Sequence, residues 1–182
     1  VAGQNDFAYN VPPRLMPLID KAKNLSKVTG PTLYCLQLYF NLAKKPLDNL
    51  KVRQAINLAL DRKSFVKASL AGVGEPAYMN LPSSHWAFVP TLVDLYPHNI
   101  DKAKKLLAEA GYPNGFEFQL NCPNNRYVND EEICIAVAGM LAKVGIKVKL
   151  SAMPRAQYFP KLEKLDTSFY MLGWGGSITD PQ

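Results

Sequence analysis

Blocks of apolar residues with two different periods run along the chain, and they predict helices and strands. Apolar positions recur every three or four residues, the helical period, in 49–60, 63–70, 99–110, 130–144 and 154–162. Compact apolar runs or strict alternation, both typical of strands, occupy 33–40, 116–122, 146–150 and 168–172. The run LYCLQLYF at 33–40 is apolar almost throughout and predicts a buried strand.

Residues that favour helix starts precede the helical blocks. Asp48 or Asn49 is placed to cap the first helix, and Asn99 or Asp101 the third. Pro154 fits the first turn of the last helix, where a missing backbone N–H costs nothing. A glycine follows three of the blocks, as expected where a helix ends.

Strands and helices alternate in the second half of the chain, which is typical of crossover connections and a largely parallel sheet. The predicted fold class is therefore α/β, with helices flanking the sheet. Proline-rich stretches at 1–31 and 72–97 predict irregular chain outside this unit. Ligands bind at the carboxyl ends of strands in open sheets of this kind, so a site is expected in the loops 123–129 and 173–180.

Composition and charge narrow the class of protein. Of 182 residues, 48% are hydrophobic and 20% are charged, as in a folded domain rather than a disordered chain. The longest apolar stretch, 133–146, contains Lys143 and Gly145 and is too short to span a membrane. The net charge is +6, but the lysines are scattered over predicted helices instead of gathered with aromatics. Nucleic acid is therefore not an expected partner.

The sequence lacks the residues that catalysis or a cofactor would need. His85 and His98 are the only histidines, and both lie in the proline-rich stretch, where an exposed polar role is expected rather than a catalytic one. No phosphate-binding loop, dinucleotide-binding turn or nucleophile elbow occurs. We therefore expect no catalytic residue, no metal site and no cofactor.

Three cysteines and one acidic cluster have structural explanations. Cys35, Cys122 and Cys134 contain no CxxC pair, which argues against a zinc or redox motif. Cys122 and Cys134 are either bridged or, as their apolar surroundings favour, buried thiols. Asp130 opens an acidic triplet at the start of a predicted helix, where negative charge suits the helix dipole.

The two loops at strand ends, 123–129 and 173–180, contain residues suited to bind a ligand. The candidate ligand-binding residues are Arg126 and Tyr127 in the first loop and Trp174, Gly175, Ser177 and Asp180 in the second. An arginine grips a carboxylate with two parallel hydrogen bonds, a tryptophan offers a flat apolar face, and a glycine lets the backbone approach a ligand. The alternatives are an exposed loop charge at Arg126 and a core aromatic at Trp174.

Six segments resemble one protein family, in the same order along the chain. They are LYFN at 38–41, PLDNLKVRQAINLALDR at 46–62, GVGEPA at 72–77, DKAKKLLAEAGY at 101–112, LAKVGIKV at 141–148 and GWGGSITDP at 173–181. Each segment is a weak signal alone, and the ordered series is specific. The chain is similar to the family 5 extracellular solute-binding proteins of ABC importers, the dipeptide, oligopeptide and nickel group.

The resemblance implies a type II periplasmic-binding-protein lobe with a mixed, largely parallel sheet. It implies that 1–31 are the end of a first lobe and its linker. It also implies that 32–182 form a second ligand-binding lobe, incomplete at its C-terminus because family members are much longer. The chain is then expected to be a fragment of a monomer that is periplasmic or lipid-anchored outside the cell.

The resemblance also implies a function that involves no catalysis. The protein would capture a small peptide-like or carboxylate-bearing solute between two lobes and deliver it to ABC permease subunits in the inner membrane. Two alternatives stay open: an α/β enzyme domain that acts on a small carboxylate ligand, and a nucleic-acid-binding module that rests on the net charge alone.

The family's ligand residues transfer unevenly to this sequence. Arg126 matches an arginine that holds the ligand carboxylate in dipeptide-binding relatives, and Trp174 matches a tryptophan that lines the pocket. Three residues after that tryptophan, peptide binders have an aspartate that pairs with the peptide amino terminus, whereas this chain has Ser177. A charge-assisted bond contributes about 1.5–3 kcal/mol and a neutral one about 1 kcal/mol. The serine therefore favours a ligand with a carboxylate and without an ammonium group.

Overall fold

Four strands form one mixed sheet at the centre of the molecule. The computed structural model describes residues 6–9, 11–30, 32–93 and 95–175. The strand order is β1-β4-β2-β3, with β1 antiparallel to β4 and the other two pairs parallel. The strands are β1 (Tyr34–Phe40), β2 (Glu117–Pro123), β3 (Lys147–Met153) and β4 (Phe169–Gly175). The predicted α/β class with a largely parallel sheet is confirmed.

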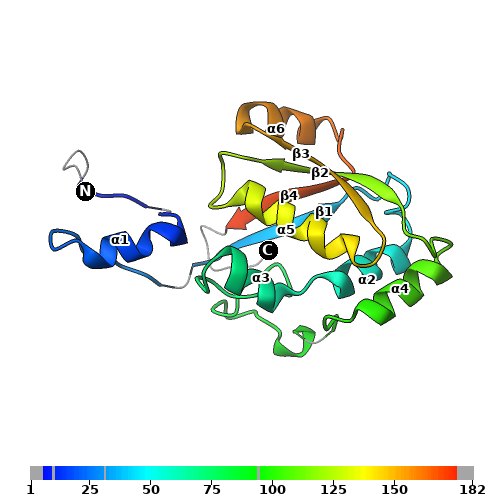
Figure 1. The fold of residues 1–182 in the computed structure, drawn as a ribbon, viewed down its shortest axis with the longest axis horizontal. Coiled ribbons are helices and arrows are strands. Elements are labelled where there is room, and N and C mark those ends of the chain that lie inside the picture. Colours follow the sequence, from blue (N-terminus) through cyan, green and yellow to red (C-terminus); the bar gives the residue numbers. More distant parts are fainter. Residues whose placement is uncertain (1–5, 10, 31, 94, 176–182) are drawn as a thin grey trace.

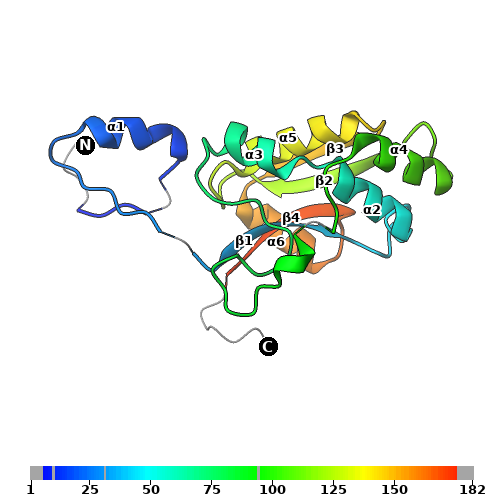
Figure 2. The same ribbon diagram turned by 90° about the horizontal axis from the view of Figure 1, so that it is seen from below.

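Helices cover both faces of the sheet (Figures 1 and 2). One face carries α2 (Leu50–Ala59), α3 (Arg62–Ser69), α4 (Ile100–Glu109) and α5 (Asp130–Ala142). The opposite face carries α6 (Arg155–Glu163), which lies on the far side of the strands in Figure 2. The main core forms under α2, α4 and α5, where Ile56, Leu107, Leu120, Leu141 and Met171 are fully buried. Their burial holds the helices against the sheet.

Side-chain caps fix where α2 and α4 begin. Asn49 accepts a hydrogen bond from the Lys51 N–H at 2.9 Å, and Asn99 accepts one from the Lys102 N–H at 2.8 Å. Asn49 and Asn99 are thus the caps of α2 and α4, which decides between the two candidates predicted at each start. Pro154 is the residue before α6 and not part of its first turn, because its backbone is extended.

Two predictions about the N-terminal half are wrong. The stretch 1–31, predicted as irregular, contains a 3-10 turn (Pro13–Leu15) followed by α1 (Met16–Lys21), and this helix lies apart from the sheet in Figure 1. Prolines are tolerated in a first helical turn, where the N–H has no partner to lose. The run predicted as a buried strand forms β1, but only Cys35 of its seven residues is buried, because β1 is an edge strand.

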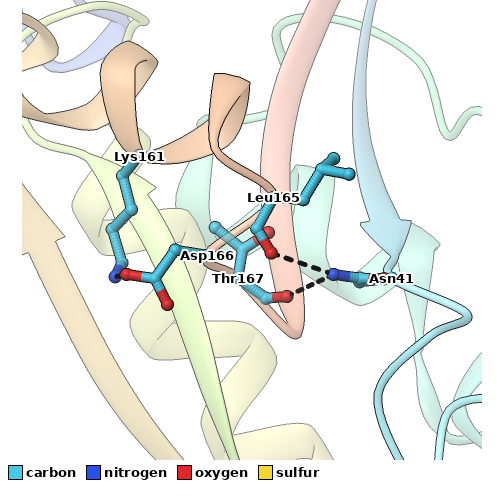
Figure 3. A network of polar contacts seen from close by, with 5 residues as sticks. All are labelled: Asn41, Lys161, Leu165, Asp166 and Thr167. Atoms are coloured by element: carbon cyan, nitrogen blue, oxygen red, sulfur yellow. Dashed lines mark hydrogen bonds and ion pairs between the residues drawn. The ribbon is translucent and has the colours of Figure 1, made fainter.

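Asn41 fixes the antiparallel pair β1–β4 at one end (Figure 3). Its Nδ2 donates to the carbonyls of Leu165 at 3.2 Å and Thr167 at 2.8 Å, both in the turn that precedes β4. Lys161 and Asp166 form an ion pair beside the same turn. The resulting register places Tyr34, the first residue of β1, opposite Gly175 at the carboxyl end of β4.

Candidate ligand-binding site

The loop between β2 and α5, residues 124–129, is anchored by one buried carboxylate. Asp130 is 4% exposed, and its Oδ2 accepts hydrogen bonds from the backbone N–H groups of Arg126 at 2.9 Å and Tyr127 at 3.0 Å. Its Oδ1 accepts a third bond, from Glu131 N–H at 3.0 Å. The sequence indicated only a helix-dipole role for Asp130. The structure adds that this side chain holds the loop in shape.

Arg126 presents a charged group at the mouth of this loop. The residue is exposed, and its Cζ lies 4.9 Å from the centre of the Tyr127 ring. No carboxylate within the described part of the chain forms an ion pair with its guanidinium. The ring orients the guanidinium by a cation–π contact while its hydrogen-bond donors stay available.

Tyr127 ties the loop to the neighbouring strand. It is half-buried, and its hydroxyl oxygen accepts a hydrogen bond from the backbone N–H of Gly173 at 3.0 Å. The Tyr34 ring lies 6.2 Å away, centre to centre. Burial, followed by the proximity of Tyr127, raises the pKa of Tyr34 to about 12, so the Tyr34 phenol is neutral at physiological pH.

A cavity of about 320 Å³ opens beside the loop. It is lined by residues 124–130 together with Pro12, Arg14 and Glu132. Arg14 Nη1 lies 3.7 Å from Glu132 Oε1, and both side chains are largely exposed, so this pair contributes little to stability. Sequence reasoning missed these three residues, since nothing in the pattern places the N-terminal stretch beside 124–130. The cavity's free guanidinium and its asparagine amides suit a ligand with a carboxylate and further polar groups.

The end of β4 does not contribute to this cavity. Phe169 and Met171 face the core, so strand alternation puts Gly173 on the same face and Trp174 on the opposite one. Trp174 is 64% exposed and therefore is not a core aromatic. The structure thus brings Arg126 and Tyr127 together but leaves Trp174 and Gly175 outside the cavity. Ser177 and Asp180 lie outside the described residues.

Cysteines and histidines show no sign of activation. Cys35, Cys122 and Cys134 are all buried free thiols, and a hydrogen bond with Cys122, together with burial, raises the pKa of the Cys134 thiol. His85 is buried, not exposed as predicted, and its Nδ1 accepts a hydrogen bond from the Ala87 N–H at 3.1 Å. Among the described residues, no cluster of acidic, histidine or cysteine side chains could hold a metal ion.

A second arginine–tyrosine contact lies between α2 and α3, in a smaller cavity of about 170 Å³. Arg62 Cζ lies 5.6 Å from the centre of the Tyr78 ring. Its guanidinium donates to Asn57 twice, to the carbonyl at 3.2 Å and to Oδ1 at 2.8 Å. Burial lowers the pKa of Arg62 from its usual value. This arginine closes the carboxyl end of α2 and is already engaged with protein acceptors.

Comparisons with known proteins agree on one family. Residues 1–182 match the family model described as bacterial extracellular solute-binding proteins, family 5 Middle. The glutathione-binding protein GsiB of Escherichia coli strain K12 is 32% identical over 180 residues, which cover 96% of this chain and 35% of that protein. The chain therefore spans about a third of the length of the curated relatives it matches.

Solved structures share the fold as well as the sequence. The DppA periplasmic binding protein of Helicobacter pylori, in complex with the peptide STSA, superposes with a TM-score of 0.87 at 26% identity. That match covers 93% of this chain and 32% of the other. AgaA of A. tumefaciens R10, in complex with agropinic acid, gives a TM-score of 0.79 at 34% identity, over 94% of this chain and 35% of the other. The expected periplasmic-binding-protein fold is thereby confirmed, and the matched proteins are binding proteins rather than enzymes.

Proposed function

The chain belongs to the bacterial extracellular solute-binding proteins of family 5, and from this premise we propose a role in solute capture. The protein binds a small carboxylate-bearing solute, such as a peptide or a peptide-derived acid, and delivers it to permease subunits of an ABC importer. It acts outside the cytoplasm, as a periplasmic or lipid-anchored monomer. Within the described part of the chain, no helix has the length and apolarity to cross a membrane.

The observation that carries this proposal is the guanidinium of Arg126. It is exposed beside a 320 Å³ cavity at the carboxyl end of β2, and no described carboxylate neutralises it. The backbone that carries it is fixed by Asp130, so the ordering of the loop is complete before any ligand arrives. A preorganised, unpaired arginine is suited to bind a ligand carboxylate with two parallel hydrogen bonds.

The organisation into lobes is part of the same proposal. Residues 32–182 form the larger part of one ligand-binding lobe, and 1–31 belong to the end of the other lobe and its linker. Pro12 and Arg14 reach the cavity from this N-terminal stretch, which supports a ligand held between two lobes. The proposal keeps Trp174, Gly175, Ser177 and Asp180 as ligand contacts that come into use when the rest of the pocket is in place.

Relatives indicate which acids to test first. Glutathione is the ligand named for GsiB, agropinic acid is bound to AgaA, and both compounds carry carboxylates. Agropinic acid extends the solute class beyond ordinary peptides. Ser177, at the position where peptide binders have an aspartate, favours solutes whose binding does not depend on a free ammonium group.

The test is thermal unfolding of the intact protein with glutathione, agropinic acid and a set of dipeptides. One of them should raise the Tm, because a ligand at 100 times its Kd stabilises the native state by about 2.7 kcal/mol. Arg126→Met should weaken that ligand by roughly 10- to 150-fold, the equivalent of about 1.5–3 kcal/mol for a lost charged hydrogen bond.

Arg155→Met is the matched control, since Arg155 is an exposed arginine at the start of α6 that does not line the cavity. Its affinity should equal that of the wild type. If no compound of the set shifts the Tm, the carboxylate class is wrong. If the bound compound is recovered chemically altered, the enzyme alternative replaces solute capture.

A further inference from the structure

Three residues from three different segments meet behind Arg126. Gly173 on β4 donates its N–H to the hydroxyl oxygen of Tyr127 in the ligand loop. Tyr34, the first residue of β1, packs against both. A Cβ at Gly173 would lie 2.0 Å from Tyr34 Oη and 2.8 Å from Tyr127 Cε1, so the two rings occupy the space that any other residue at 173 would fill.

The direction of the hydrogen bond between Gly173 and Tyr127 follows from the two groups that form it. The Gly173 N–H can only donate, so the Tyr127 oxygen accepts it and keeps one lone pair and one proton. The Tyr34 phenol lies beside this hydrogen bond: the two rings are 6.2 Å apart, centre to centre, and the Tyr34 oxygen fills the space next to Gly173 and the Tyr127 ring. Burial, followed by the proximity of Tyr127, raises the pKa of Tyr34 to about 12.

The consequence concerns the ring on which Arg126 rests. Tyr127 has its backbone held by Asp130 and its hydroxyl held by Gly173, and the Tyr34 ring packs beside it, so the Tyr127 ring is fixed at both ends. The Arg126 guanidinium lies over this ring at 4.9 Å. We propose that Tyr34 and Tyr127 are positioning residues, which set the orientation of the Arg126 guanidinium for the solute carboxylate without contacting the solute through their hydroxyls.

The position of Tyr34 links this cluster to the segment that connects α1 to β1. Residues 22–30, 32 and 33, which connect α1 to β1, lead directly into Tyr34. A displacement of this connecting segment therefore also displaces the Tyr34 ring that packs against Tyr127. The proposal rests on the solute-capture role of Arg126. It implies that the segment before β1 also influences the affinity for the solute.

One arm of the test needs no solute. The Arg126 Nε–H signal of the intact protein, labelled with 15N-arginine, should carry an upfield ring-current shift from Tyr127. In Tyr34→Phe this signal should move toward the position of a free arginine, because the Tyr34 oxygen no longer fills the space between Gly173 and the Tyr127 ring. Tyr39→Phe is the matched control. Tyr39 lies on the same strand and loses a hydroxyl bond to Gln37 Oε1 at 2.6 Å, but strand alternation places it on the opposite face from Tyr34.

A steric variant provides an independent second arm. Gly173→Ala should displace both tyrosine rings and change the Arg126 signal at least as much as Tyr34→Phe. Gly139→Ala on α5 is its control, because a Cβ there meets no atom within 4 Å. An Arg126 signal that stays unchanged in both Tyr34→Phe and Gly173→Ala overturns the proposal, even if no solute has been identified.

The solute arm separates this inference from the proposed function. With glutathione as probe, Tyr127→Phe should weaken binding by about 5- to 10-fold, as expected for one neutral hydrogen bond, and Tyr34→Phe, which empties the space beside the Tyr127 ring, should weaken it less. In the Arg126→Met background these losses should disappear, because positioning acts only through the guanidinium. Full additivity would overturn the inference and leave solute capture intact. No effect of Arg126→Met on glutathione binding would instead count against the proposed function.

Discussion

Two arginines of this protein lie over tyrosine rings, but their guanidinium groups differ in exposure and in hydrogen-bond partners. Arg62 lies over Tyr78 at 5.6 Å and Arg126 over Tyr127 at 4.9 Å. Arg62 is half-buried and donates twice to Asn57, whereas Arg126 is exposed and its guanidinium has no described carboxylate partner. The contact with the ring is thus shared, and the acceptors around the guanidinium decide which arginine stabilises the fold and which is available to a ligand.

Each arginine also lies near an aspartate at a helix start, and the two aspartates differ in the same way. Asp61 caps α3 by accepting one backbone bond, from Ser64 N–H at 3.0 Å. Asp130 is buried at the start of α5 and accepts three backbone bonds. The aspartate with more backbone bonds therefore lies beside the arginine without a described carboxylate partner. The 124–129 loop depends on these bonds for its shape because its arginine lacks the protein acceptors that hold Arg62.

The largest expected effect follows from the buried anchor. Asp130→Ala leaves three N–H groups without their acceptor, each bond to a charged group contributing about 1.5–3 kcal/mol before the loop relaxes. We expect unfolding of the intact protein in urea to show a loss of about 3 kcal/mol. Asp130→Asn keeps one carbonyl oxygen as acceptor and should lose less. A loss in Asp130→Ala of less than about 1 kcal/mol would show that the carboxylate is not the anchor.

Substitution of the two arginines should change the stability measured by urea unfolding to different extents. Arg62→Met removes two hydrogen bonds to Asn57 from a half-buried site and should destabilise the protein by about 2 kcal/mol. Arg126→Met removes an exposed charge with no described acceptor and should change stability by less than about 0.5 kcal/mol. The comparison breaks down if Arg126→Met destabilises as much as Arg62→Met.

The sequence predicts the regular helices well, because their signals are local. Apolar spacing placed the helix at 63–70 and the structure has α3 at Arg62–Ser69, while the cap Asn99 set the start of α4. The strand predicted at 146–150 continues to Met153, since its last residues pair with Asn121, Cys122 and Pro123. Such pairing depends on a strand thirty residues away, which no local pattern reveals.

The candidate site was predictable only in part, for the same physical reason. Arg126 and Tyr127 follow a predicted strand, so their place at a carboxyl end could be foreseen. The hydrogen bond from Gly173 to Tyr127 joins residues 46 positions apart, and no local pattern in the sequence indicates it. The direction of Trp174 depends on the register that sets it opposite Cys35, so its face could not be assigned from spacing alone.

A smaller effect than those at Asp130 and Arg62 is expected at Asp61, the weaker of the two aspartate anchors. Hydrogen bonds from the Ser64 side chain and backbone lower the pKa of Asp61 in the folded protein. A lowered folded pKa means that the carboxylate stabilises the fold above its unfolded pKa of about 3.9, and that this contribution is lost as pH falls further. Asp61→Ala should therefore cost about 1 kcal/mol at pH 7, the usual contribution of a helix cap.

The pH dependence of this difference tests the assignment. The gap in Tm between wild type and Asp61→Ala should be constant from pH 7 to about pH 5 and should close as pH falls through the folded pKa of Asp61. Asp61→Asn keeps a capping oxygen that does not titrate, so it should stay close to the wild type at pH 7. A gap that widens on acidification would mean that Asp61 is destabilised by its surroundings. The two aspartates would then differ in kind and not only in strength.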